Sequence, residues 1–156
     1  RGVDFLDFII PWEATNGSGA FEIDVADSPF QPLRITGEMR AVAPQFIKTG
    51  GFIHALRQDL SPLTVANPAR SGETVTLLMR GLGPVDSQGR TLQTSTIFAS
   101  AFPSVEIVSS EVDPGTPGTY RLAFRLPAVT EGPLTLFVRG PGDEYASDSG
   151  LLPVEP

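Results

Sequence analysis

The side chains that could carry out catalysis are few and lie far apart in this 156-residue sequence. His54 is the only histidine, and no acidic residue stands beside it in the stretch FIHAL. A general base needs a partner that orients it, so we expect His54 on a strand face and not in a catalytic site. No Gly-x-Ser-x-Gly motif marks a hydrolase nucleophile. No nucleophile, base and orienting group can be assembled, and an enzyme is not expected.

Metal and cofactor chemistry has little support either. Asp143, Glu144 and Asp148 form an acidic group that could hold calcium, but they lack the Asp-x-Asp-x-Asp-Gly spacing of an EF-hand loop. A solvated turn is the expected role of this group. The chain has no cysteine, which excludes disulfides and thiolate metal sites. We therefore expect no metal and no cofactor.

Gly81 and Gly83 raise the question of a phosphate-binding loop. Such a loop needs a following helix, because the helix N-terminal amides face the anion. The residues that follow, PVDSQG, form turns and do not open an amphipathic helix. We expect the two glycines to let the chain turn out of a strand.

The elements that position these residues are predicted to be short strands. Apolar residues alternate with mostly polar ones at 74–80, 120–126 and 134–139, which is the period of a half-buried strand. Turns rich in Gly, Pro, Asp and Asn, Asn67-Pro68 among them, flank and separate these runs, as in an all-β sandwich. The alternation predicts a core that includes Val75, Leu77, Leu122, Phe124, Leu134 and Leu136.

Charge and hydropathy exclude several partners. The formal net charge is -7 and Lys48 is the only lysine, so nucleic acid and anionic membrane surfaces are not expected partners. No apolar run approaches the roughly 20 residues of a membrane span, so membrane insertion is not expected.

The sequence also repeats itself. Residues 2–25 can be laid over 118–138 with the apolar phase kept through two strands and the turn between them. The match places Phe21 on Leu134 and Ile23 on Leu136. It predicts two copies of one supersecondary unit, of which only the second is expected to have its upstream half.

The motifs resemble a known family. The stretches NPARSGETVTLLMRGLGPV, VDPGTPGTYRLAFRLPAVTEGPLTLFVRG and SGLLPVEP resemble the Solibacter-type C-terminal domain of large secreted proteins of Acidobacteria. The earlier VDFLDFIIPWEATNGSGAFEIDV and AVAPQFI resemble the preceding repeat of those proteins. The resemblance implies tandem immunoglobulin-like β-sandwiches in an exported protein, and it implies no activity.

Together these patterns predict two domains and a structural role. Residues 1–45 would be the C-terminal half of one immunoglobulin-like repeat, and residues 46–156 a complete sandwich. The expected function is a non-catalytic extracellular module that spaces, anchors or assembles a secreted or cell-surface protein. The alternative is an accessory or carbohydrate-binding module at the C-terminus of a larger secreted enzyme, for which Trp12, Tyr120 and Tyr145 are the candidate aromatic residues.

The incomplete first repeat predicts an interface. The three strands expected in the first repeat, at 3–10, 21–25 and 33–42, cannot bury both faces of a sandwich, so open edges and an apolar face would remain. The expected partner is a second copy of the chain or the upstream part of its own polypeptide, which would add β-strands. Phe46 is expected at a short, stiff junction between the repeats. The expected interface residues are Leu6, Phe8, Ile10, Trp12, Phe21, Ile23, Val25 and Phe46.

Overall fold

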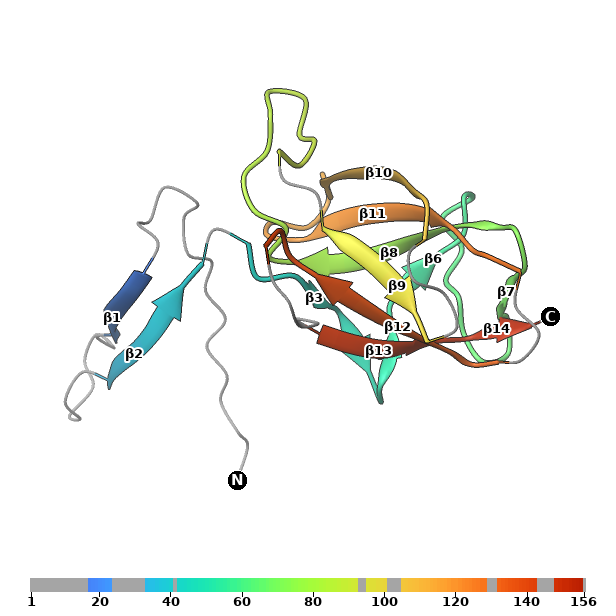
Figure 1. The fold of residues 1–156 in the computed structure, drawn as a ribbon, viewed down its shortest axis with the longest axis horizontal. Coiled ribbons are helices and arrows are strands. Elements are labelled where there is room, and N and C mark those ends of the chain that lie inside the picture. Colours follow the sequence, from blue (N-terminus) through green and yellow to red (C-terminus); the bar gives the residue numbers. More distant parts are fainter. Residues whose placement is uncertain are drawn as a thin grey trace. The chain divides into compact units, whose positions relative to one another are not determined.

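A computed structural model describes residues 17–23, 33–40, 42–92, 95–100, 105–128, 132–142 and 148–155. Over these ranges the chain is all-β, with strands in several sheets (Figure 1). No helix in the described part has the length and apolar character needed to cross a membrane. The chain divides into two compact units, Arg1–Ala41 (unit 1) and Val42–Pro156 (unit 2). The boundary predicted from the sequence follows Gln45.

The described part of unit 1 is a pair of antiparallel strands. Strand β1 (Gly17–Ile23) pairs with β2 (Leu33–Met39) from Gly17 opposite Met39 to Ile23 opposite Leu33. The sequence predicted strands at 21–25 and 33–42, so both strands exist but their ends differ.

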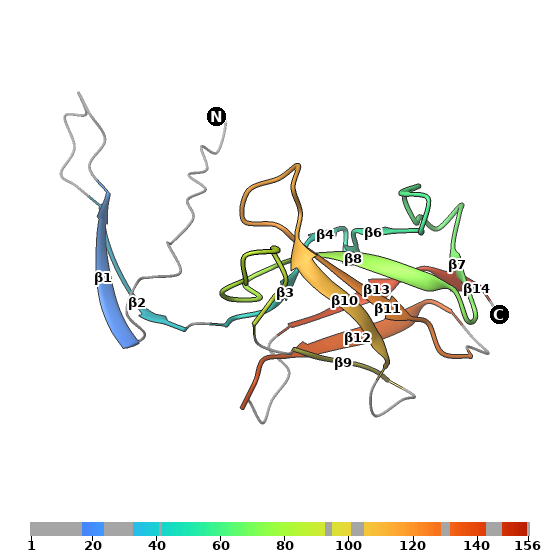
Figure 2. The ribbon, with the colours of Figure 1, turned by 90° about the horizontal axis from the view of Figure 1, so that it is seen from above.

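The described residues of unit 2 form two five-stranded sheets (Figures 1 and 2). In the first sheet the order is β10-β11-β8-β3, and β6 also pairs with β8. In the second sheet the order is β4-β5-β13-β12-β9. A further pair, β14 and β7, is parallel. The strands are β3 (Gln45–Phe46), β4 (Lys48–Thr49), β5 (Phe52–Ile53), β6 (Ala55–Leu56), β7 (Ala69–Arg70), β8 (Thr74–Arg80), β9 (Thr96–Ala99), β10 (Ile107–Val112), β11 (Tyr120–Arg125), β12 (Leu134–Arg139), β13 (Asp148–Leu152) and β14 (Val154–Glu155).

The three longest runs of alternation form strands where the sequence predicted them. Strand β8 alternates between buried and half-buried residues along most of its length, and β11 and β12 follow the same pattern. Both sheets contribute to one hydrophobic cluster, so their inner faces share a core. The six residues predicted for this core are all buried: Val75, Leu77, Leu122, Phe124, Leu134 and Leu136.

Strand β8 ends at Arg80, and the chain turns out of it at Gly81 and Gly83, as predicted. Gly81 has φ of 70° and Gly83 has φ of 87°, a region that residues with a Cβ avoid. The Ala43 amide donates a hydrogen bond to the Gly81 carbonyl at 2.9 Å. A Cβ on Gly81 would lie 2.1 Å from the Ala43 carbonyl oxygen, so the close approach of these two segments requires glycine. No helix follows in the described residues, and the phosphate-loop alternative has no support here.

The first segment of unit 2 crosses from one sheet to the other. Strand β3 pairs with β8, β4 and β5 form a hairpin in the second sheet, and β6 returns to β8. The hairpin turns through Gly50 and Gly51, whose φ values are 58° and 85°. Positive φ at both central residues is the requirement of a type I′ turn. Residues of this crossing segment line a pocket on unit 2.

Candidate functional site

A pocket of about 420 Å³ opens on unit 2 beside the crossing segment. Strands β4, β5 and β6, together with the residue between β5 and β6, form one part of its wall. Residues 62–65 form another part, and β8 and the C-terminal segment contribute one residue each. The lining residues are Thr49, Phe52, Ile53, His54, Ala55, Leu56, Pro62, Leu63, Thr64, Val65, Leu78 and Pro153. Most of them are apolar, and none is an acid, a lysine or an arginine.

One polar pair stands in this apolar lining. The Thr49 hydroxyl and the His54 Nε2 share a hydrogen bond of 2.7 Å. The His54 backbone is fixed independently, because its amide donates to the Ile47 carbonyl and its carbonyl accepts from the Leu78 amide. The side chain of His54 is exposed, so the pair can be reached from solvent.

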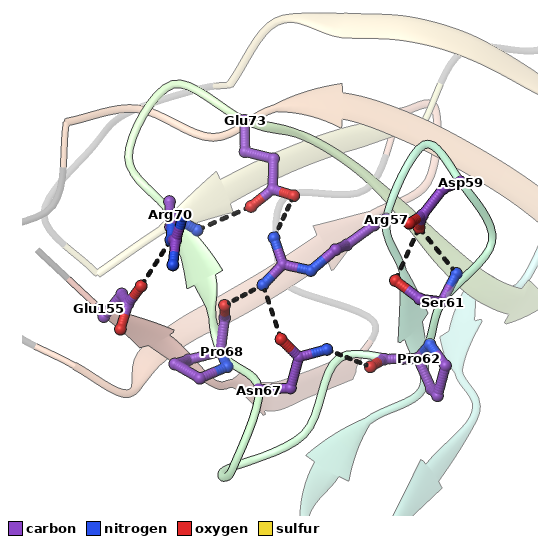
Figure 3. Close-up of polar contacts among 9 residues, drawn as sticks. All are labelled: Arg57, Asp59, Ser61, Pro62, Asn67, Pro68, Arg70, Glu73 and Glu155. Atoms are coloured by element: carbon purple, nitrogen blue, oxygen red, sulfur yellow. Dashed lines mark hydrogen bonds and ion pairs between the residues drawn. The ribbon is translucent and has the colours of Figure 1, made fainter.

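The loop 57–68 carries the second part of the wall, and Arg57 holds it in place (Figure 3). The Arg57 guanidinium forms an ion pair with Glu73. Its Nη2 donates to the Asn67 side-chain oxygen at 3.1 Å and to the Pro68 carbonyl at 2.5 Å. The guanidinium group of Arg57 therefore ties the start of the loop to its end and to Glu73, the residue before β8.

Shorter contacts shape the loop between these ends. The Asp59 carboxylate accepts hydrogen bonds from the Ser61 hydroxyl at 2.6 Å and the Ser61 amide at 3.0 Å (Figure 3). These bonds, the hydroxyl first, hold the pKa of Asp59 below its ordinary value. The Leu63 amide donates to the Ala55 carbonyl at 2.8 Å, which fastens the loop to β6. The pocket wall is thus a hydrogen-bonded structure.

Glu73 connects the loop to the end of the chain. Besides the Arg57 pair, its second carboxylate oxygen accepts from the Arg70 amide at 2.8 Å. The Arg70 side chain in turn pairs with Glu155 of β14 at 2.7 Å. The polar network of Figure 3 therefore joins the loop 57–68 and the neighbouring residues Arg70 and Glu73 to Glu155, which is 85 positions from Arg70 in the sequence.

Asp148 was predicted to lie in a solvated turn, but the structure places it in a strand, with hydrogen-bond partners on two other strands. Asp148 begins β13, and its carboxylate accepts from the Phe46 amide at 2.8 Å and from the Lys48 Nζ at 2.7 Å. It therefore fastens β3 and β4 to β13. Asp143 and Glu144 lie outside the described residues. No three His, Asp or Glu side chains in the described ranges are placed to hold a metal ion.

Most of the expected interface residues lie outside the described part of the chain. These are Leu6, Phe8, Ile10, Trp12 and Val25. Phe21 and Ile23 lie on β1, opposite Ile35 and Leu33 of β2. Phe46, expected at the junction, is 5% exposed and belongs to the hydrophobic core of unit 2. Tyr120, a candidate for stacking a sugar, donates its hydroxyl to the Gly83 carbonyl at 2.7 Å, and burial raises its pKa. Tyr145 is outside the described residues.

The pocket and the Arg57 network were not predicted from the sequence. Two of their parts did have a signal: Asn67-Pro68 was predicted as a turn, and His54 was singled out as a lone histidine. The Arg57–Glu73 pair joins residues 16 positions apart across a loop, and no local pattern indicates such a contact.

Comparison of the chain with protein-family models, with curated proteins and with solved structures found no match. The family resemblance of the sequence motifs therefore stays a prediction. Function has to be argued from the arrangement of the described residues.

Proposed function

We propose that unit 2 is an immunoglobulin-like β-sandwich and that the chain is a non-catalytic structural module outside the cell. In this role it spaces, anchors or assembles a secreted or cell-surface protein. The resemblance of the sequence to secreted tandem-repeat proteins supports the location, and three features of the fold support the role.

Strand order supports the immunoglobulin-like assignment. Constant-type immunoglobulin domains have one sheet in the order A-B-E-D and another in the order C-F-G. In unit 2 the order β3-β8-β11-β10 matches the first sheet and β9-β12-β13 matches the second, when β3 to β6 are taken together as strand A. The crossing of strand A between the sheets accounts for its division into short strands.

The observation that carries the structural role is the use of charged side chains in unit 2. Lys48–Asp148 joins β4 to β13, Arg57–Glu73 closes a loop, and Arg121–Asp113 fixes the turn before β11. These pairs are partly shielded from solvent, with exposed fractions of 32% or less for each side chain. Charged side chains used in this way hold strands and loops in place, which suits a structural module.

Unit 1 supports the tandem arrangement and suggests how copies assemble. The repeat in the sequence places β1 on β12, and both strands pair antiparallel with the strand that follows them. The β1–β2 pair would then be the F–G pair of the first repeat. The sheet described for these residues has two strands, and a two-stranded sheet offers two edges. Strands from a second copy, or from another part of the same polypeptide, would complete it.

Light scattering on the purified chain 1–156 tests the assembly part of this proposal. We expect particles larger than a monomer at micromolar concentration, and electron microscopy should show whether they are ordered filaments. Phe21→Asp, which puts a charge on β1, should reduce assembly. The matched control Val108→Asp, at an exposed position of unit 2, should leave it unchanged.

A stable, well-folded monomer of the chain 1–156 at the same concentration would contradict assembly through β1 and β2. Fractionation of the source cells tests the location separately. The native protein should be recovered from the cell surface or the medium, and its recovery from the cytoplasm alone would contradict the extracellular role.

A further inference from the structure

The pocket bordered by Thr49, His54 and the loop 57–68 has no part in the structural role proposed above. We propose that it binds a small, uncharged and mainly apolar ligand that carries one hydrogen-bonding group next to Thr49 and His54. The inference rests on the size, charge and rigidity of the pocket.

The pocket has the dimensions and lining of a ligand site. Its volume of about 420 Å³ lies within the roughly 300–1,000 Å³ of small-molecule sites, which combine apolar walls with a few polar groups. Phe52, Leu56 and Val65 are among the apolar residues that line it. Val65 is 70% exposed, so a ligand in the pocket would cover an apolar side chain that water now contacts.

Charge in this region favours a neutral ligand. The lining contains no acidic side chain, no lysine and no arginine. The charged groups on the neighbouring segments do not line the pocket: Arg57 pairs with Glu73, Lys48 pairs with Asp148, and Asp59 accepts hydrogen bonds from Ser61. A charged ligand would lose its hydration without gaining an opposite charge, which is unfavourable.

The Thr49–His54 pair gives the ligand its orientation. A threonine hydroxyl has one donor and two acceptor sites. Its bond to His54 Nε2 uses one of these sites, so a further hydrogen bond to a ligand hydroxyl or carbonyl is available. The apolar part of the ligand would then lie against Leu56 and Val65.

The wall is formed before any ligand arrives. Arg57 holds both ends of the loop, and the Leu63 amide bonds to the Ala55 carbonyl. Because the loop is already ordered, binding of a ligand does not require the loss of conformational entropy that ordering a loop would cost. Because these hydrogen bonds fix the wall, the pocket is a lasting feature of the fold and not a gap that moving side chains open by chance.

The test uses the full chain 1–156 and the fluorescent probe 2-naphthol, which is neutral at pH 7 and has an apolar body with one hydroxyl. The charged analogue 2-naphthoate is the control ligand. We expect saturable binding of 2-naphthol and binding at least about tenfold weaker for 2-naphthoate, because the carboxylate must be desolvated.

Three variants test whether 2-naphthol binds in this pocket. Val65→Glu adds a charge at the pocket and should weaken 2-naphthol binding by about tenfold. Val108→Glu makes the same change at an exposed valine of β10 (58% exposed). The dissociation constant of 2-naphthol from this variant should equal that from the unaltered chain. Thr49→Val keeps the side-chain shape, removes the hydroxyl and should weaken binding by roughly two- to tenfold. Unfolding curves of all three variants show whether each is folded.

Three results would overturn the proposal. The first is non-saturable binding of 2-naphthol. The second is an equal loss of affinity in Val65→Glu and Val108→Glu. The third is a change of self-association, and not of probe affinity, in Val65→Glu, since this would identify a second copy as the occupant.

Discussion

Strand β8 and the segment 42–68 contribute to the same core of unit 2, but they are stabilised in different ways. Strand β8 is regular: it pairs with β11 over its length, and Val75, Leu77 and Met79 are fully buried. The segment 42–68 changes sheets twice and forms only two-residue strands. Its shape depends on individual polar contacts, chiefly those of Arg57 and Asp148.

This difference suggests a division of tasks within the domain. Burial of alternate side chains provides most of the stability, and it is distributed over many contacts. Individual hydrogen bonds and ion pairs contribute less free energy but decide where a chain segment lies. The pocket is found beside the segment positioned in this second way.

Truncation of a core side chain should have the largest effect on stability. Phe124 is fully buried in β11, so Phe124→Ala should lower the free energy of unfolding by roughly 3 to 5 kcal/mol. Val108→Ala, at an exposed position, should change it by no more than about 0.5 kcal/mol. Urea unfolding of both variants measures the difference, and equal midpoints would show that Phe124 is not in the core.

The next effect concerns the contact between the two regions at Gly81. In Gly81→Ala the new Cβ meets the Ala43 carbonyl in addition to the strain of a positive φ. We expect a loss of roughly 2 to 4 kcal/mol. Gly72 has φ of 79° with open space around it, so Gly72→Ala isolates the strain and should cost about 1 kcal/mol. Similar losses in both variants would mean that the segments do not approach as closely as described.

Removal of the loop brace should have a smaller effect. Arg57→Met keeps much of the side-chain length but leaves Glu73 and the Pro68 carbonyl without this donor, and should cost roughly 1 to 3 kcal/mol. Arg70 also forms an ion pair, with Glu155, but its side chain is 74% exposed. Arg70→Met should therefore lower the urea midpoint less than Arg57→Met does, because solvent weakens an exposed ion pair. If Arg70→Met lowers the urea midpoint more than Arg57→Met does, the contacts of Arg57 are not what holds the loop.

The smallest effects are expected from two carboxylates in turns, Asp59 in the loop 57–68 and Asp86 in the turn after β8. Asp59 accepts from Ser61, and Asp86 accepts first from the Arg90 amide and also from the Gln88 amide, so both have a lowered pKa. A carboxylate whose pKa is lower in the folded state stabilises the fold above its unfolded pKa. The contribution is lost as the pH falls through the folded pKa, that is, in the acid range below the ordinary value of 3.8.

A carboxyl-carbon NMR titration checks both groups. The two folded-state pKa values should lie below 3.8. A value at or above it would mean that the corresponding turn is open in solution.

The same comparison explains what the sequence could and could not predict. The regular strands β8, β11 and β12 were predicted because alternation is a local signal that several consecutive residues repeat. Two-residue strands such as β3 and β6 carry no period. Strand β10 has an irregular pairing with β11 between Ile107 and Ser109, which breaks its alternation.

The candidate site was beyond prediction for a related reason. Arg57, Asn67 and Glu73 look like ordinary polar residues of turns and strand ends. They come together only because the loop folds back on β6, and the Leu63–Ala55 hydrogen bond that fastens it has no sequence signature. The Asn67-Pro68 turn and the lone His54 marked the neighbourhood of the pocket but not the pocket.

Hydrogen exchange of the β1 and β2 amides in the chain 1–156 tests the central claim most directly, namely that strands of a second copy complete the β1–β2 sheet. Exchange should be measured on the assembled fraction and on a diluted monomeric fraction. We expect the amides of both strands to be protected in the assembly and to exchange much faster in the monomer, while those of β8 stay protected in both. Equal protection of β1 and β2 in the two fractions would contradict it.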